Sequence, residues 1–302
     1  MALPERVRAW RERGVDEEFR GRRIHLTARG GRDPLLVLLH GFPSSSYDWR
    51  LLLEEETEHA ALAPDFLGFG LSEKPRDHTY TLHWQADLVE ELVRRHGRGN
   101  PVFLVAHDMG TSVATELMAR DLEGRLDMEL TGVLLLNGSM VQGAASPTIA
   151  QRILRSRVGP LFSRLSSERF FRQQFGSIFS PDHPLTEEEA EDQWALVCAG
   201  GGRTLNHKTI RYMEERFHHA ERWHGALRDW PPTNGASASR PGAAPLSLAW
   251  GMLDPVATEA VLDAILELRP GAPVTRFEDL GHYPQIEDPG RVAAALRAVL
   301  GA

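Results

Sequence analysis

The chain has 302 residues, 42% of them apolar, and carries 34 basic against 42 acidic side chains, for a formal charge of −8. This composition supports a large apolar core and excludes a disulfide-stapled miniprotein, a fibrous repeat and a disordered chain. Because the basic residues are scattered, nucleic acid is not an expected partner. No apolar run is long enough to span a bilayer, and residues 1–23 lack the apolar segment of a signal peptide. We therefore expect a soluble, cytoplasmic protein with no membrane partner.

Short apolar runs bounded by turn residues predict the strands of a buried, mostly parallel sheet. They are Leu35–Leu39, Ala60–Ala63, Val102–Ala106, Val133–Leu136, Leu246–Trp250 and Val274–Phe277. The stretch Arg20–Thr27 is expected to add an antiparallel edge. Apolar residues at helical spacing predict helices over Tyr80–His96, Gly110–Asp121, Thr258–Leu268 and Arg291–Leu300. This alternation favours a doubly wound α/β fold.

The alternation stops between about Ser139 and Ala226, where no buried strand is predicted. Helical spacing recurs there over Ile149–Leu154, Leu161–Phe171, Glu187–Val197 and His207–Phe217. We therefore expect a core formed by residues 1–138 and 227–302, with residues 139–226 inserted as a helical cap over the strand ends. Thr233–Ala244, rich in Ala, Ser, Gly and Pro, predicts a flexible loop.

The junction after the Val102–Ala106 strand carries the main chemical signal. It reads Ala106-His107-Asp108-Met109-Gly110-Thr111 and precedes a predicted helix. Small residues two before and two after Asp108 allow a very sharp turn that lifts its side chain above the sheet. No G-x-S-x-G occurs in the chain, which excludes a serine esterase of this design. Alone, Asp108 could equally be a simple helix cap.

Two further residues favour a catalytic interpretation of Asp108. Asp254 follows the Leu246–Trp250 strand, and His282 lies in a loop after the last predicted strand. The order nucleophile, acid, base is that of the α/β-hydrolase triad, with aspartate in place of serine. Singly, Asp254 and His282 would be ordinary turn residues.

The loop His40-Gly41-Phe42-Pro43 follows the Leu35–Leu39 strand. In this type of fold, such a loop and the residue after the nucleophile each give one N–H group to an oxyanion hole. We assign these donors to Phe42 and Met109. Without the Asp108 turn, the loop would be an ordinary Gly-Pro turn.

Together these motifs resemble the epoxide hydrolase and haloalkane dehalogenase branch of the α/β hydrolases. The similarity includes the segment D-F-L-G-F-G-L-S at residues 65–72 and H-Y-P-Q-I-E-D-P at residues 282–289. Within the branch, the chain looks most like the mesoderm-specific transcript protein-like hydrolases. The resemblance extends over almost the whole chain and implies an α/β-hydrolase fold with a cap.

The resemblance also implies a two-step reaction. Asp108 would attack an sp³ carbon to form an ester, which water activated by His282 would then hydrolyse. An epoxide also needs a proton donor, and Tyr212 is the only cap tyrosine, where relatives commonly have two. Met109 is unusual as well, because tryptophan is common at that place. A half-buried structural tyrosine is the alternative for Tyr212.

The function expected first is therefore an epoxide hydrolase acting on small apolar substrates. A haloalkane dehalogenase is the alternative, although neither Phe42 nor Met109 offers a side-chain donor to a halide, which leaves the indole of Trp194. A further alternative is a degenerate hydrolase that binds a hydrophobic ligand without turnover. The pocket is expected between cap and core, and its expected lining is Phe42, Met109, Trp49, Trp194, Phe170 and Phe171.

No cofactor or metal is expected. His218, His219 and His224 crowd one cap segment, but no H-E-x-x-H or comparable ligand set accompanies them in the sequence. Gly200-Gly201-Gly202 follows no strand and predicts a helix break. Cys198 is the only cysteine and is expected in the core. The sequence leaves open whether the chain forms a homodimer.

Overall fold

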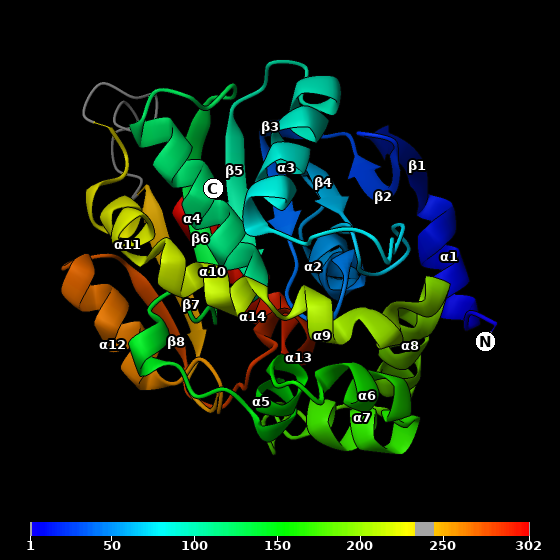
Figure 1. The fold of residues 1–302 in the computed structure, drawn as a ribbon. Helices are drawn as coiled ribbons and strands as arrows, with labels where there is room; N and C mark the ends of the chain where they lie inside the picture. The colour runs from blue at the N-terminus through cyan, green and yellow to red at the C-terminus, as the bar shows by residue number, and fades with distance from the viewer. Residues whose placement is uncertain (1, 233–244, 302) are drawn as a thin grey trace.

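A computed structural model describes residues 2–232 and 245–301. The predicted loop Thr233–Ala244 lies outside the described residues. In the described part of the chain, the strands form one sheet in the order β1-β2-β4-β3-β5-β6-β7-β8 (Figure 1). Its strands are β1 (Gly14–Phe19), β2 (Arg22–Arg29), β3 (Arg32–Leu39), β4 (His59–Pro64), β5 (Val102–His107), β6 (Leu130–Leu136), β7 (Leu246–Gly251) and β8 (Val274–Phe277).

The sheet is parallel except at one edge. Strands β3 to β8 pair in parallel, whereas β2 pairs antiparallel with both β1 and β4. The fold is that of an α/β hydrolase, as predicted. The expected antiparallel strand is β2, but it is not the edge. The edge strand is β1, which was not predicted because three of its six residues are charged and only Phe19 is buried.

Successive residues of the central strands point to opposite faces and form two apolar cores. Leu35, Val37 and Leu39 of β3 pack with α3 (Leu82–His96), α4 (Met109–Leu122) and α12 (Glu259–Leu268). Leu36 and Leu38 pack with α2 (Arg50–Glu55) and α14 (Pro289–Leu300) on the other face. Because the strands are covered on both sides, they appear in the sequence as continuous apolar runs.

The described part of the segment between β6 and β7 is mainly helical. Its helices are α5 (Ile149–Arg155), α6 (Gly159–Leu165), α7 (Glu168–Gly176), α8 (Glu187–Cys198), α9 (Asn206–Thr209), α10 (Tyr212–His218) and α11 (Ala220–Asp229). The predicted helix Leu161–Phe171 is in fact two helices, because the Ser167 side chain accepts the Phe170 N–H and caps a new helix. The predicted helix His207–Phe217 is also divided, since Arg211 and Met213 donate to carbonyls three residues back. The cap boundaries at 139 and 226 remain a prediction.

The predicted helix break at Gly200 and Gly201 coincides with positive φ angles of 59° and 82°. Figure 1 shows α5, α6 and α7 together at one end of the molecule, with α8 beside the N-terminal helix α1 (Glu5–Arg13). Arg6 of α1 joins these helices through an ion pair to Asp192 of α8 at 2.7 Å. No helix in the described ranges is long and apolar enough to cross a membrane.

Candidate active site

Asp108 occupies a strained turn between β5 and α4. Its φ of 44° is in a region that side chains other than glycine rarely adopt. Two glycines make this turn possible. A Cβ on Gly110 would lie 2.2 Å from the Leu39 carbonyl oxygen, and one on Gly41 would lie 2.8 Å from the Asp108 Cβ. The small residues near Asp108 therefore serve the close approach of backbone segments at the carboxyl edge of the sheet.

The Asp108 side chain is buried, and its carboxylate is held by the loop after β3. The Phe42 N–H donates to Oδ2 at 2.9 Å. Met109, also buried, follows directly in the chain as the first residue of α4. The Phe42 N–H thus already meets the carboxylate on which a tetrahedral oxyanion would form. The cis Phe42–Pro43 peptide belongs to the same loop.

Two buried histidines support this arrangement. His40 Nε2 accepts the Phe66 N–H at 3.0 Å, so its Nδ1 carries the proton and donates to the Gly41 carbonyl at 2.8 Å. His107 Nε2 donates to the carbonyl of His282 at 2.7 Å. Burial lowers the pKa of both imidazoles, which keeps them neutral at pH 7. They orient the donor loop and the backbone of the candidate base.

His282 and Asp254 form a buried pair at the carboxyl ends of neighbouring strands. His282 Nδ1 lies 2.7 Å from Asp254 Oδ2. Burial lowers the pKa of His282, but the charge and hydrogen bond of Asp254, together with the Asp108 charge, outweigh it, so the pKa is raised above 6.5. With Nδ1 bonded to Asp254, Nε2 is the nitrogen left to accept a proton.

Asn137, which was not predicted from the sequence, holds the Asp254 carboxylate. Its Nδ2 donates to Asp254 Oδ2 at 2.8 Å and to the Gly251 carbonyl at 3.1 Å, while its Oδ1 accepts the Gly251 N–H at 2.8 Å. The Val256 N–H donates to the other oxygen of Asp254 at 2.7 Å. Asn137 has a φ of 38° directly after β6. An asparagine immediately after a buried strand was the available sequence signal.

Tyr212, the predicted proton donor, lies buried on α10 beside Asp108. Burial raises its pKa, and the charge of the neighbouring Asp108 raises it further, so the hydroxyl stays protonated. Its ring lies 6.0 Å from the Phe42 ring, centroid to centroid. The structure therefore brings Asp108, Phe42 and Tyr212 together from three separate parts of the chain.

Arg216 is a second site residue that was not predicted from the sequence. It follows Tyr212 by one helical turn, is only 1% exposed, and its Cζ lies 4.8 Å from the centre of the Tyr212 ring. Its Nη2 is 3.1 Å from the Asp108 carbonyl oxygen and 3.8 Å from Oδ1, and its Nε donates to Ser112 Oγ at 2.7 Å. The same helix thus delivers an acid and a cation to Asp108. Nothing in its sequence distinguished Arg216 from an exposed helical arginine.

An apolar cavity of about 720 Å³, including its opening to solvent, adjoins these residues. It is lined by Phe42, Pro43, Thr148, Ala150, Gln151, Leu154, Phe162, Ser163, Ser166, Phe170, Phe171, Gln174, Phe175, Ile178, Asn206, Val256 and His282. Phe42, Phe170 and Phe171 were predicted there. Asp108, Met109 and Tyr212 are not part of the lining, although Phe42, which lines the cavity, contacts Asp108 directly.

Three of the six expected lining residues, Met109, Trp49 and Trp194, do not line the cavity. Trp49 is fully buried, because it packs in the apolar core that α2 and α14 cover on one face of the sheet. Trp194 packs against Phe171 and lines a separate surface pocket with Cys198 and Arg203. Cys198 itself is half-buried at that surface, not in the core.

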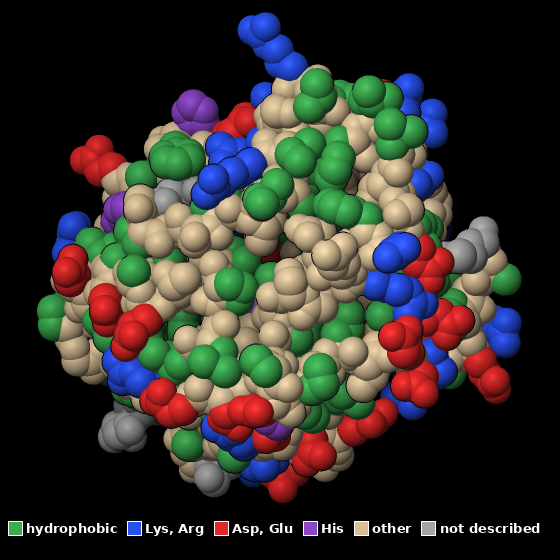
Figure 2. All heavy atoms as spheres, turned by 90° about the horizontal axis from the view of Figure 1, so that it is seen from below, with side chains coloured by type: hydrophobic (Ala, Val, Ile, Leu, Met, Phe, Trp, Pro, Cys, Tyr) green, Lys and Arg blue, Asp and Glu red, His purple; other side chains and the backbone are tan. Residues whose placement is uncertain are grey.

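Figure 2 shows the face on which α5, α6 and α7 lie. Hydrophobic side chains are spread across its middle, and most charged side chains lie toward its edge. Ile149, Leu161 and Leu165 are 59–73% exposed on these helices. An apolar substrate would therefore meet apolar surface outside the cavity as well as within it.

Comparison with known proteins identifies the class to which this fold and site belong. The model of the alpha/beta hydrolase family matches residues 36–295, and the chain belongs to that family. "Putative hydrolase LipZ" of Mycobacterium tuberculosis is 46% identical over 294 residues, covering 97% of this chain and 98% of LipZ. The mesoderm-specific transcript protein of Mus musculus is 33% identical, covering 94% of this chain and 84% of its own length, which confirms that predicted resemblance.

A solved structure shows the same fold. The haloalkane dehalogenase DatA from Agrobacterium tumefaciens C58 aligns with a TM-score of 0.75 at 22% identity, covering 95% of this chain and 96% of DatA. The family and these relatives show a hydrolase of the α/β class.

Proposed function

We propose that this hydrolase opens an apolar epoxide to a vicinal diol through an ester on Asp108. The observation that carries the proposal is the Tyr212 hydroxyl beside the Asp108 carboxylate, in a site that also holds the His282–Asp254 pair. A carboxylate nucleophile suits attack on an sp³ carbon, and a neutral phenol next to it suits protonation of the oxygen that leaves.

In the first step, an oxygen of Asp108 bonds to one epoxide carbon while the bond from that carbon to the ring oxygen breaks. Since Phe42 holds Oδ2, we assign the attack to Oδ1. The ring oxygen takes the Tyr212 proton, and the product is a hydroxyalkyl ester of Asp108. The raised pKa of Tyr212 keeps that proton on the hydroxyl until an alkoxide forms.

In the second step, His282 Nε2 takes a proton from water, and the hydroxide attacks the Asp108 Cγ. The tetrahedral oxyanion accepts the N–H groups of Phe42 and Met109. Its collapse releases the diol and restores the carboxylate. The proton that His282 gained passes through solvent to the tyrosinate and restores the Tyr212 hydroxyl. The sum is epoxide plus water to diol.

The cavity supports an apolar substrate that reaches the reacting groups past Phe42 and His282. Dehalogenation, the second candidate, has the fold of DatA in its favour. It needs N–H donors for the halide. The described residues lining the cavity include no tryptophan and, besides the base His282, offer only the side-chain amides of Gln151, Gln174 and Asn206, while Phe42 and Met109 have no side-chain donor. The Phe42 N–H and Arg216 contact Asp108, and Asp254 contacts His282. A ligand binder without turnover would not need these contacts, which disfavours that alternative.

The test measures diol formation from styrene oxide and bromide release from bromoalkanes. We expect diol formation, and we expect Tyr212→Phe to slow formation of the enzyme ester at least tenfold, since general acids contribute about 10²–10⁴-fold. Tyr47→Phe is the matched control, because Tyr47 is also buried and donates to a carboxylate, that of Asp192 at 2.7 Å. Bromide release without diol formation would replace this proposal with the dehalogenase.

A further inference from the structure

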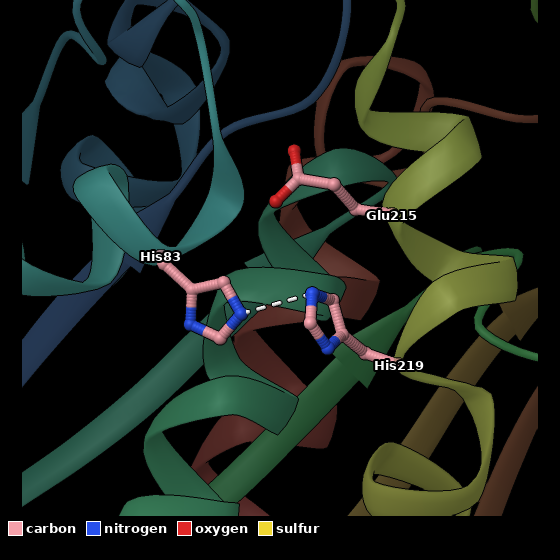
Figure 3. A group of neighbouring side chains, drawn as sticks. All are labelled: His83, Glu215 and His219. Atoms are coloured by element: carbon pink, nitrogen blue, oxygen red, sulfur yellow. Dashed lines mark hydrogen bonds between the residues drawn. The ribbon is translucent and has the colours of Figure 1, made fainter.

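Three side chains of types that can bind a metal, His83, Glu215 and His219, lie close together between α3 and α10. They are not part of the candidate active site around Asp108. Figure 3 shows His83 of α3 facing His219, with Glu215 of α10 above them. One ligand atom from each residue lies within 4.8 Å of those of the other two. His83 and His219 are 136 positions apart in the chain, which is why no ligand spacing appears in the sequence.

The two imidazoles have the geometry of a metal ligand pair. Their Nε2 atoms are 3.2 Å apart, and the ring planes are at 82°. Two nitrogens bound tetrahedrally to Zn²⁺ at about 2.0–2.1 Å lie about 3.3 Å apart, so the present spacing is close to that of a zinc site.

A buried carboxylate supports His83 from behind. Glu116 Oε1 lies 3.1 Å from His83 Nδ1, which assigns the Nδ1 proton to that contact and leaves Nε2 with a lone pair. Glu116 is 1% exposed and is fixed by Arg120 and by the Trp223 indole at 2.9 Å. A carboxylate behind a ligating histidine is a common outer partner of zinc sites.

Glu215 supplies the third ligand and is itself held in place. Both of its oxygens accept the N–H of Leu82, at 3.0 and 3.1 Å. Leu82 precedes His83, so the carboxylate and one imidazole are tied to the same turn of α3. One ligand oxygen of Glu215 lies within 4.8 Å of the ligand nitrogens of His83 and His219.

We propose that His83, Glu215 and His219 bind a Zn²⁺ ion, with water as the fourth ligand. Two imidazoles and one carboxylate form a ligand set that zinc favours over magnesium or calcium. Without metal, the Nε2–H of His219 donates to Nε2 of His83, and zinc binding at both Nε2 atoms requires the His219 proton to move to Nδ1. The ion would join α3 to α10, the helix that carries Tyr212 and Arg216 to Asp108.

The test uses purified full-length protein, freed of metal with a chelator and titrated with ZnCl₂ against a chromophoric zinc chelator. We expect one zinc per chain with a dissociation constant in the micromolar range or below. His219→Ala and Glu215→Gln should weaken binding at least tenfold. His218→Ala is the matched control, because His218 is the exposed last residue of α10, directly before His219, and this variant should bind zinc as the wild type does.

A second measurement locates the ion. Zinc should slow amide hydrogen exchange in residues 212–218 and at the start of α3 in the wild type and in His218→Ala, but not in Glu215→Gln. Glu215→Gln keeps an acceptor for Leu82 and serves as the test if His219→Ala does not fold. Equal zinc affinity in all variants, loss of binding in His218→Ala, or no binding by the wild type would overturn the proposal.

Discussion

Replacing Asn137 by alanine tests whether the Asn137 side chain holds the Asp254 carboxylate in place, as the hydrogen bonds of the structure indicate. The asparagine side chain is fully buried and makes three hydrogen bonds, one to Asp254 and two to the backbone of Gly251. Alanine at this position keeps the φ of 38° but makes none of these three bonds. Both the free energy of unfolding and the orientation of Asp254 should therefore change.

The magnitude follows from the hydrogen bonds that the substitution removes. The bond to the Asp254 carboxylate is charge-assisted and contributes about 1.5–3 kcal/mol, and a buried Gly251 N–H without an acceptor costs about 1–3 kcal/mol. Alanine in the left-handed region adds about 1–2 kcal/mol. Because relaxation and entering water recover part of these costs, we expect a loss of about 3–5 kcal/mol, at the upper end of single substitutions.

Urea unfolding followed by fluorescence measures this loss, with Asn100→Ala as the control. Asn100 lies in the loop before β5 and is half-buried, so its replacement should change stability by less than about 0.5 kcal/mol. A loss below about 1 kcal/mol in Asn137→Ala, with an unchanged slope, would refute the hydrogen-bond network around Asp254.

Further predictions concern the charges around the two carboxylates. Since the pKa of His282 is raised above 6.5, its imidazole gains a proton as the pH falls toward that value, and the rate of ester hydrolysis should decline with it. A rate that stays flat from about pH 8 to pH 5 would exclude His282 as the base. Asp254→Asn should move this decline to lower pH and slow hydrolysis by up to about 10⁴-fold, as followed by single-turnover kinetics; an unmoved decline would show that Asp254 does not set the pKa. Arg216→Met leaves the buried Asp108 without its cation and should cost about 3–5 kcal/mol in urea unfolding, and a variant as stable as the wild type would remove Arg216 as a partner of Asp108.

The fold could be predicted because its strands are buried on both faces. Val102–Ala106 and Val133–Leu136 are continuous apolar runs with turn residues around them, and each became a strand with nearly the predicted bounds. The charged segment Gly14–Phe19 carries no such signal, because an edge strand is half exposed. The predicted cap helix Leu161–Phe171 is divided at Ser167, because a serine can cap the start of a helix as readily as it can lie within one, and the sequence does not distinguish the two.

Residues of the candidate site could be predicted only where a short stretch of sequence forms a recognisable motif. Asp108 and His282 each lie in such a segment. Arg216 and Asn137 contact Asp108 and Asp254 through tertiary structure, and neither has a local pattern that separates it from a surface arginine or a turn asparagine. Trp49 was misplaced for a similar reason, because its packing in the core with α2 and α14 is a tertiary contact that no local pattern shows.

The most direct test of the account is the mass of the His282→Ala variant after incubation with styrene oxide. If Asp108 is the nucleophile and His282 the base that hydrolyses its ester, the variant gains the mass of one epoxide, and peptide mapping finds it on Asp108. The double variant Asp108→Asn/His282→Ala should show no gain. An unmodified His282→Ala protein, or an adduct on another residue, would contradict the central role of Asp108.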